Sequence, residues 1–474
     1  MLPLLFRLLH TLNWYASAGL KCDGRPVYSC SESLFYTQQT DVLTQIESRI
    51  LEHTEHLSPS AMENIQLVKI RSIFDSAKHI PFWNPRPEAM SILSRRVRSM
   101  SALKQLPILT RADIQRGFKN KNTLNETIPK RRRAFAQTSG STGEPLFVYL
   151  DTIVVCGRRA RFRRKIKWLS GGTSTLVVKG MGAAPLGFTN FKGVRFFTIR
   201  NDKNSNSSLA DMCVLLRGIL HHTSDAIIID TYPSNVMRLV PILLQSGIDT
   251  SRILGFVCGG EALLPGEREY VRTTLGCDIR SYYASTEFEI IGQECGQSPE
   301  HAFHVNAEYF YVEIVDEKGN PLPRNETGRV IITSLEHEAQ PFIRYDTGDL
   351  GHLLAQPCSC GRTLPLLVVE GRQANLIRLP NGRSFTQFNV IGHFYNPEVV
   401  SQIRQFQVVH ERPDVFTIKL VPQSTTVEQQ ERAIEILKAR LLETFGEDTH
   451  VSFEIIDSIP VTERGKSIGY VSNF

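Results

Sequence analysis

Residues 138–145 have the residue types that suit phosphate binding. They read Thr-Ser-Gly-Ser-Thr-Gly-Glu-Pro, with two glycines and four hydroxyl residues in the first six positions. Such a loop can offer backbone N–H groups and hydroxyls to phosphate oxygens. It is not a Walker A loop, because the Gly-Lys-[Ser/Thr] ending is missing. Taken alone, it is equally compatible with an ordinary Ser/Gly linker. The six candidate residues are Thr138, Ser139, Gly140, Ser141, Thr142 and Gly143.

Five further short motifs follow this loop along the chain. They are Gly259-Gly260-Glu261, Tyr282-Tyr-Ala-Ser-Thr-Glu287, Tyr345-Asp-Thr-Gly-Asp349, Gly371-Arg372 and Arg464-Gly-Lys466. In this order, the set resembles the adenylate-forming superfamily of acyl-CoA synthetases, peptide-synthetase adenylation domains and luciferases. It is most similar to the phenylacetate–CoA ligase-like branch, which includes proteins grouped with capsular-polysaccharide biosynthesis. The resemblance covers nearly the whole chain, from Leu106-Pro-Ile-Leu-Thr-Arg111 to the final Gly-Lys.

This resemblance implies that the chain activates a carboxylic acid with ATP, giving acyl-AMP and pyrophosphate. Attack of a carboxylate on the α-phosphate builds negative charge, so the site must supply cations and oriented donors. By resemblance, residues 138–143 would hold the β- and γ-phosphates and Thr286 would contact the α-phosphate. Glu287 would help to hold Mg²⁺. Lys466, on a mobile C-terminal segment, would be the catalytic cation that bridges the α-phosphate and the carboxylate oxygen.

The resemblance also implies how the rest of the nucleotide is bound. Gly259, Gly260 and Glu261 would lie near the adenine and the acyl pocket. Asp349 only accepts hydrogen bonds when ionised, which suits the two ribose hydroxyls. Arg372 would sit near the ribose and phosphate, just before the hinge. The remaining nucleotide-binding candidates precede Thr286 and are Tyr283, Ala284 and Ser285.

Two positions depart from the family pattern. Ala374 and Asn375 follow Gly371-Arg372 where an acidic hinge residue is common. This departure leaves the adenylation step as predicted but leaves the domain rotation, and hence thioester formation, open. The usual Tyr-Gly before Thr-Glu is Tyr283-Ala284, which would narrow the substrate pocket.

Three functions remain open for the chain. The first is transfer of the acyl group to CoA, with an aryl or arylacetic acid as substrate. The second passes the acyl-AMP directly to an amine, a hydroxyl or a carrier protein, because a fold alone does not choose an acceptor. The third is a non-catalytic nucleotide-binding homologue, which the presence of Lys466, Glu287 and Asp349 disfavours.

Four further residues could bind a metal. Cys295, His304, Cys358 and Cys360 supply three thiolates and one imidazole, which suit a tetrahedral zinc site. Members of the phenylacetate–CoA ligase-like branch carry a comparable arrangement, which favours this interpretation. His301 is an alternative ligand, and free buried cysteines are the alternative to a metal. We expect a structural Zn²⁺, because protein ligands would fill all four positions.

The elements that must position these residues predict an α/β fold in two parts. Residues 1–371 would form a large N-terminal adenylation domain with several subdomains, and residues 372–474 a small mobile α+β C-terminal domain. Helices are predicted at 38–57, 59–79 and 90–100, and another starts after an N-cap at Thr110. Short apolar strands then alternate with helices at 235–245 and 265–274. A hairpin spans 309–333, and the C-terminal part has strands near 405–410, 415–421 and 450–456 with one helix at 427–445.

Composition limits the compartment and the partners. The chain of 474 residues is 41% hydrophobic and 22% charged, with a formal net charge of +6. The short basic run Lys130–Arg133 favours a solvated loop over a nucleic-acid site. The five arginines between Arg158 and Arg164 are predicted to form a solvated helix face. Residues 1–20 are predicted to form an amphipathic helix, without stable membrane insertion. Nine cysteines without a framework pattern indicate a reducing compartment, so we expect a cytoplasmic protein.

Overall fold

The chain divides into two compact units, each built from two stretches of sequence. The first unit comprises Met1–Trp168 and Tyr282–Val369, and the second Leu169–Ser281 and Glu370–Phe474. The computed structural model describes residues 38–83, 97–120, 123–129, 133–137, 146–173, 175–180, 187–191, 194–198, 213–214, 216–221, 224–263, 265–299, 301–373, 376–386, 390, 393–395, 397–400, 402–422, 426–459 and 469–473.

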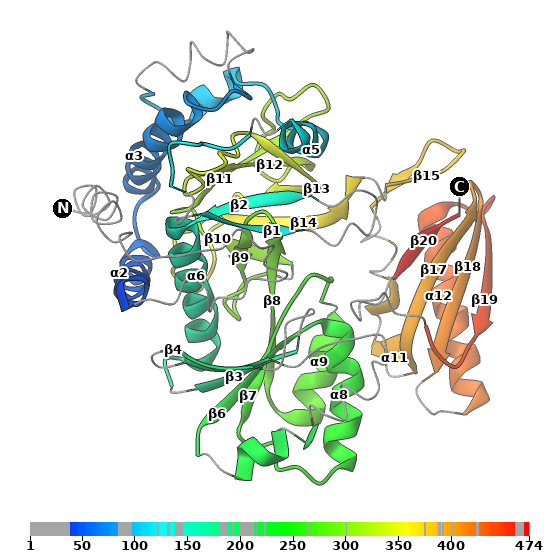
Figure 1. The fold of residues 1–474 in the computed structure, drawn as a ribbon. Helices are drawn as coiled ribbons and strands as arrows, with labels where there is room; N and C mark the ends of the chain where they lie inside the picture. Colours follow the sequence, from blue (N-terminus) through cyan, green and yellow to red (C-terminus); the bar gives the residue numbers. More distant parts are fainter. Residues whose placement is uncertain are drawn as a thin grey trace. The chain divides into compact units, whose positions relative to one another are not determined.

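The first unit contains helices α2 and α3, a 3₁₀ turn η2, helices α5 and α6, and most strands of a mixed sheet (Figure 1). Strands β1 and β2 form a separate antiparallel pair. The strands of this unit's part of the sheet follow the order β11-β12-β13-β14-β10-β9-β8. The bounds are α2 Gln38–Thr54, α3 Pro59–Ala77, η2 Met100–Gln105, α5 Arg111–Lys119, β1 Arg133–Gln137, β2 Phe147–Asp151, α6 Thr152–Ser170, β8 Asp278–Ser285, β9 Glu289–Gln293, β10 Ala302–Val305, β11 Phe310–Val315, β12 Gly328–Ser334, β13 Tyr345–Leu353 and β14 Leu366–Arg372.

The second unit begins with an α/β region in which the strands follow the order β7-β6-β3-β5-β4. The first four of these strands are parallel, and β4 pairs antiparallel with β5. Ile227, Ile228 and Ile229 are fully buried, as expected for a parallel strand covered on both faces. The bounds are β3 Thr175–Gly180, β4 Gly187–Phe191, β5 Val194–Thr198, β6 Ala226–Thr231, α8 Pro233–Gln245, β7 Ile253–Gly259 and α9 Pro265–Leu275.

The C-terminal part of the second unit has its own hydrophobic cluster. Its four-stranded sheet has the order β19-β18-β17-β20, and helix α12 buries Ala433, Leu437, Leu441 and Phe445, which are spaced four residues apart. The bounds are β15 Ile377–Arg378, β16 Ser384–Phe385, η5 His393–Tyr395, α11 Pro397–Val400, β17 Ile403–Arg412, β18 Val415–Pro422, α12 Val427–Phe445, β19 His450–Ile455 and β20 Tyr470–Ser472. The domain boundary at residue 371 stays a prediction.

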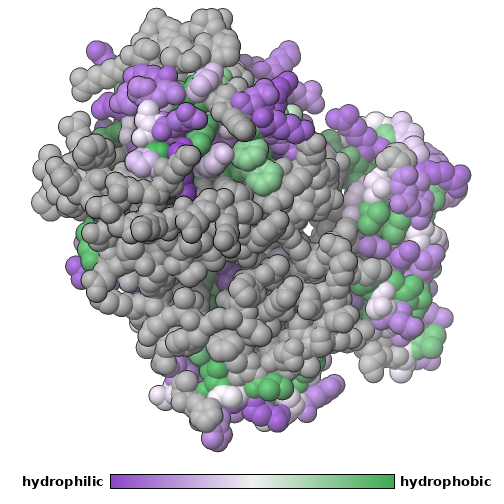
Figure 2. All heavy atoms as spheres, viewed as in Figure 1, coloured by the Kyte–Doolittle hydropathy of each residue, from purple (hydrophilic) through white to green (hydrophobic). Residues whose placement is uncertain are grey.

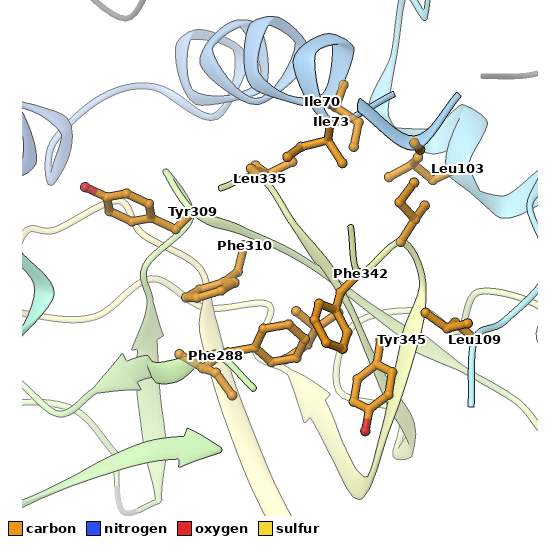
Figure 3. Close-up of a cluster of buried hydrophobic side chains, with 14 of the residues drawn as sticks. Ile70, Ile73, Leu103, Leu109, Phe288, Tyr309, Phe310, Leu335, Phe342 and Tyr345 are labelled. Atoms are coloured by element: carbon orange, nitrogen blue, oxygen red, sulfur yellow. The ribbon is translucent and has the colours of Figure 1, made fainter. Parts of the chain in front are cut away.

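Aromatic side chains form the centre of the first unit's core (Figure 3). The Phe288 ring contacts the rings of Phe310, Phe342 and Tyr345 at centroid distances of 5.6, 5.3 and 5.8 Å. All three contacts are edge-to-face, the geometry that aromatic pairs favour. Phe288 directly follows the predicted Thr286-Glu287 motif, so this core fixes one end of that motif.

The mixed α/β class and most predicted elements are confirmed. Thr110 caps α5 as predicted, in a capping box with Asp113. The predicted helix at 90–100 and the amphipathic helix at 1–20 lie largely or wholly outside the described residues. Within the described part of the chain, no helix is long and apolar enough to cross a membrane.

The prediction of a solvated arginine face was wrong. Arg158, Arg159, Arg161 and Arg164 are all buried in helix α6. Acidic side chains and backbone carbonyls of the same unit pair with three of them, Arg158, Arg161 and Arg164. On the described part of the surface in Figure 2, hydrophobic side chains lie in small groups among hydrophilic ones.

Candidate functional site

The predicted Thr286-Glu287 motif lies in a tight turn between β8 and β9. The turn covers residues 286–288, and Glu289 follows it with a positive φ of 59°. The Glu287 side chain is buried, although it carries a carboxylate. The Tyr345 hydroxyl donates a hydrogen bond of 2.9 Å to Glu287 Oε1, and Arg111 Nη1 lies 3.8 Å from the same oxygen. Glu287 is therefore a buried carboxylate held by one hydrogen bond, from Tyr345, and one longer ion pair, with Arg111.

Backbone pairing places Tyr345 and Arg111 next to Glu287. Leu109 forms a bridge with Tyr345: its N–H donates to the Arg344 carbonyl, and its own carbonyl accepts from the Asp346 N–H, both at 2.8 Å. The Thr110 cap then starts α5, so Arg111 is the first helical residue. Two motifs more than 200 residues apart in the sequence thus meet at one carboxylate.

Asp349 lies on β13, and its carboxylate also accepts a hydrogen bond, from a hydroxyl of the segment that contains Thr286 and Glu287. The Tyr283 hydroxyl on β8 donates a hydrogen bond to Asp349 Oδ2. Gly348 has a φ of 73°, which favours glycine, and the Asp349 N–H donates to Thr347 Oγ1 at 3.2 Å. Tyr283 and Asp349 thus meet through their side chains although β14, β10 and β9 separate their strands in the sheet order, and Ala284 and Ser285 lead from Tyr283 to the turn that holds Glu287.

Gly259, Gly260 and Glu261 lie in the second unit, at the carboxyl end of β7. Gly260 has a φ of 80°, so the backbone turns sharply there. A Glu261 carboxylate oxygen then accepts the Ser234 N–H at 3.2 Å. Ser234 belongs to the first turn of α8, where N–H groups lack helical partners and a carboxylate is stabilising. Arg372 is exposed at the end of β14, whose last three residues already belong to the second unit.

Seven predicted residues lie outside the described residues. They are the phosphate-loop candidates Thr138, Ser139, Gly140, Ser141, Thr142 and Gly143, and the catalytic candidate Lys466. The described parts of the loop's flanks are β1 and β2.

Two arginines of α6 contact the Thr-Glu turn and were not predicted. Arg158 Nη2 donates to the carbonyls of Thr286 and Glu287, at 3.1 and 2.9 Å. Arg161 Nη2 donates to the next carbonyl, that of Phe288, at 3.2 Å. A signal was present in the sequence: Arg158, Arg161 and Arg164 are three residues apart and so share one helix face.

These buried arginines are compensated by carboxylates. Arg161 makes a two-pronged pair with Glu336, with both N–O distances at 2.8 Å, and both side chains are fully buried. Burial alone would lower the pKa of Arg161, but Glu336 outweighs it and raises this pKa. Arg164 pairs with Glu308 at 2.7 Å and also donates to the Leu51 carbonyl. Helix α6 thus places Arg161 and Arg164 in the core, each paired with a carboxylate.

The four predicted metal ligands come together in the first unit. The ligand atoms of Cys295, His304, Cys358 and Cys360 all lie within 4.8 Å of one another. The Cys295 and Cys358 sulfurs are 3.6 Å apart, and Cys360 Sγ lies 3.4 Å from His304 Nε2. Around a tetrahedral zinc, the expected spacings are about 3.8 Å between sulfurs and about 3.6 Å between sulfur and nitrogen. The cluster contains His304, and His301 is not part of it.

The surroundings of this cluster are apolar. Cys295 and Cys358 pack with Ala302 and Leu366, and the Trp168 ring meets the His304 ring edge-on at 5.5 Å. Burial would raise the pKa of the Cys295 thiol, but hydrogen bonds with His304 and Ser298 outweigh it and lower the pKa to about 5. Burial raises the pKa of Cys358 to about 12. Three thiols and an imidazole in a closed, buried set fit a structural zinc ion.

Comparison with known proteins gives partial sequence matches. The model of the CapK C-terminal domain family matches residues 381–473. A phenylacetate-coenzyme A ligase of Thermus thermophilus is 33% identical over 143 residues, which cover 29% of this chain and only 32% of the relative. A phenylacetate-coenzyme A ligase of Escherichia coli K12 is 22% identical, with 86% of this chain and 94% of the relative covered.

A solved structure supports the fold. The crystal structure of a 2-hydroxyisobutyryl-CoA ligase in the postadenylation state matches with a TM-score of 0.72 at 15% sequence identity. The match covers 89% of this chain and 92% of that chain. At this identity the likeness shows a common fold.

Proposed function

Because this chain belongs to the adenylate-forming superfamily, in its phenylacetate–CoA ligase-like branch, we propose that it is an ATP-dependent acid–thiol ligase. It would convert a carboxylic acid and ATP to an acyl-AMP and pyrophosphate, and then transfer the acyl group to CoA. The observation that carries this proposal is the buried Glu287 carboxylate, which contacts Tyr345 and Arg111; Tyr345 lies on β13, the strand that also carries Asp349.

The chemistry requires a site that tolerates a growing negative charge. The substrate carboxylate oxygen attacks the α-phosphorus, and the bond to the bridging oxygen of pyrophosphate breaks. In the second step the CoA sulfur attacks the acyl carbon, AMP leaves, and the thiol proton passes to solvent. Thr286 would donate to the α-phosphate during the first step, and Lys466 would supply the cation that compensates the new charge.

Glu287 fits the role of a magnesium ligand. Carboxylate oxygens are the ligands that Mg²⁺ takes in phosphoryl-transfer sites, where the ion neutralises charge on the phosphates. Tyr345 and Arg111 would keep the Glu287 carboxylate in one orientation. Glu287 therefore needs little rearrangement to bind.

The nucleoside would be held by the other motifs. Asp349 would accept hydrogen bonds from the two ribose hydroxyls, and Arg372 would lie near the ribose and phosphate. Gly259, Gly260 and Glu261 would line the adenine and acyl side, and Ala284 and Ser285 the backbone next to the α-phosphate. Residues 138–143 would bind the β- and γ-phosphates. We place the domain boundary after residue 371, with residues 372–474 as the mobile C-terminal domain and the hinge just after Arg372.

The Cys295–His304–Cys358–Cys360 cluster would hold one structural Zn²⁺. All four ligand positions come from the protein, so the ion would have no open position for chemistry. It would link the β9–β10 region to the segment between β13 and β14, and so stabilise the sheet that carries Glu287 and Asp349. We further propose that the enzyme works in the cytoplasm.

The test is pyrophosphate release with ATP, Mg²⁺ and a panel of aryl, arylacetic and short carboxylic acids, each with and without CoA. Acid-dependent release that rises with CoA supports the acid–thiol ligase. Release indifferent to CoA would replace CoA by an amine, a hydroxyl or a carrier protein as acceptor. Failure to release pyrophosphate with every acid would overturn the proposed activity in favour of a non-catalytic nucleotide-binding protein.

A matched pair of variants tests the role of Glu287. Glu287→Gln should lower release at least tenfold, because a neutral amide is a poorer Mg²⁺ ligand. Glu313→Gln is the control: Glu313 is also a buried carboxylate paired with an arginine, Arg344, at 3.2 Å. It should keep normal release per folded molecule. Equal activity of the two variants would remove Glu287 from the site.

A further inference from the structure

We infer that Arg158 is a positioning residue for this reaction, and this inference rests on the proposed function. Its guanidinium would hold the Thr286–Glu287 turn, so that the Glu287 carboxylate and the Thr286 donor keep their places relative to Mg²⁺ and ATP. Arg158 itself would touch neither ligand.

The contacts of Arg158 are directed at the turn's backbone. One guanidinium nitrogen, Nη2, donates to two successive carbonyls, those of Thr286 and Glu287. Its Nε lies 3.6 Å from a carboxylate oxygen of Glu289, the residue just after the turn. The Arg158 side chain thus contacts three of the four residues 286–289, namely Thr286, Glu287 and Glu289. These contacts use two nitrogens of one planar guanidinium, Nη2 and Nε, whereas a lysine ammonium has all its donors on a single nitrogen.

Arg161, about one helical turn after Arg158, also donates to the backbone of this turn. It donates to the carbonyl of Phe288, while Glu336 fixes its guanidinium from the other side. Three successive carbonyls, at residues 286, 287 and 288, therefore accept from one helix face. The turn lacks regular strand pairing, so these donors supply hydrogen bonds that its buried carbonyls require.

Gly157, the residue before Arg158, lets helix α6 lie close to Glu336 and Tyr309. A Cβ at this position would overlap with Glu336 Oε2 and press on Tyr309 and Arg161. Arg158 itself is only 7% exposed, so its guanidinium is desolvated and its contacts are stronger than at the surface. Its shortest contacts go to the carbonyls of Thr286 and Glu287, and its ion pair with Glu289 is longer, at 3.6 Å, so its hydrogen-bond donors serve mainly the backbone of the turn.

The experiment compares Arg158→Lys and Arg158→Met with Arg164→Lys. Arg164 is the matched control: it lies on the same helix face and is also buried, but its contacts lie away from the turn, at Leu51, Thr54, Glu55, Asn306 and Glu308. The first readout is hydrogen exchange of the segment 283–291 in the folded protein, which needs no ligand. The second is the Mg²⁺ concentration that gives half-maximal pyrophosphate release.

Both Arg158 variants should exchange at least tenfold faster in this segment and need about tenfold more Mg²⁺. Arg164→Lys should lower stability without changing either value per folded molecule. Unchanged exchange, or faster exchange with an unchanged Mg²⁺ requirement, would overturn the positioning role. Full recovery by Arg158→Lys would also overturn it, because the charge and not the fork geometry would then matter. If wild-type protein releases no pyrophosphate, the proposed function fails, and the exchange readout still decides whether Arg158 holds the turn.

Discussion

Replacing Tyr345 with phenylalanine should separate the placement of Glu287 from the packing of the core. The substitution removes only the hydroxyl that donates to Glu287 Oε1 at 2.9 Å. The ring contacts with Phe288 and Phe342, at 5.8 and 5.3 Å, remain possible for phenylalanine. The variant therefore leaves the hydrophobic burial nearly unchanged and takes one donor from a buried carboxylate.

The size of the effect follows from that lost donor. A hydrogen bond to a charged group contributes about 1.5–3 kcal/mol, and Tyr345 is buried at 3% exposure, so solvent does not replace it readily. We expect the free energy of unfolding to fall by this amount. The Mg²⁺ requirement for pyrophosphate release should rise by up to about tenfold, since 1.4 kcal/mol corresponds to a factor of ten.

The assay is a double-mutant cycle in urea. Tyr345→Phe, Glu287→Gln and the double variant should give a coupling free energy of about 1–3 kcal/mol. Tyr311→Phe is the control. It removes a hydroxyl from the same unit, but the carboxylates near that hydroxyl are those of Glu313 and Glu63 and not that of Glu287. A coupling near zero, with the Mg²⁺ requirement unchanged, would refute the view that Tyr345 holds the Glu287 carboxylate.

Three further predictions concern other parts of the chain. Lys466→Ala should lower pyrophosphate release by about 10²–10³-fold, whereas Lys438→Ala on the exposed side of α12 should not; unchanged release in the first would mean a wrong catalytic cation. Cys360→Ser should lose zinc measured by plasma mass spectrometry, and the buried Cys277→Ser should keep it; wild-type protein that is stable without zinc would exclude a structural ion. Burial raises the pKa of Asp151 to about 7, so the folded state holds a proton that the unfolded chain has lost between about pH 4 and 7. The contribution of Asp151 to unfolding free energy should therefore fall by up to about 1.4 kcal/mol per pH unit across this window, and Asp151→Asn should remove that slope in denaturation curves; equal slopes would contradict it.

Elements with a strong local pattern were predictable from the sequence. The helix predicted at 427–445 has those bounds, because its apolar residues recur on one face and Gly446, with a φ of 102°, ends it. The Thr110 cap was likewise visible, since Asp113 stands three residues later. The four candidate metal ligands, Cys295, His304, Cys358 and Cys360, were identified by residue type, and their side chains lie close together in the structure.

Contacts between distant residues were not predictable in the same way. The motifs named Tyr283 and Asp349 separately, but no local pattern indicates that one donates to the other across 66 positions. The arginines of α6 are the clearest case. A basic stretch usually faces solvent, and its burial here depends on Glu336 and Glu308, which lie more than 140 positions away. The spacing of three residues between Arg158, Arg161 and Arg164 indicates a shared helix face, but not the partners of that face.

The Arg161–Glu336 pair shows what the buried charges contribute. Arg161→Met alone should lower the unfolding free energy by about 3–5 kcal/mol, because it leaves the fully buried Glu336 carboxylate without its cation. Arg161→Met with Glu336→Leu should recover most of that loss, since an apolar pair needs no desolvation of charge. The recovery should stop about 1 kcal/mol short, because the Phe288 carbonyl still lacks its donor. Such a variant would be nearly as stable as wild type, yet hydrogen exchange at 283–291 should remain faster. If exchange there returned to the wild-type rate, the arginines would serve the stability of the core and not the geometry of the Thr286–Glu287 turn.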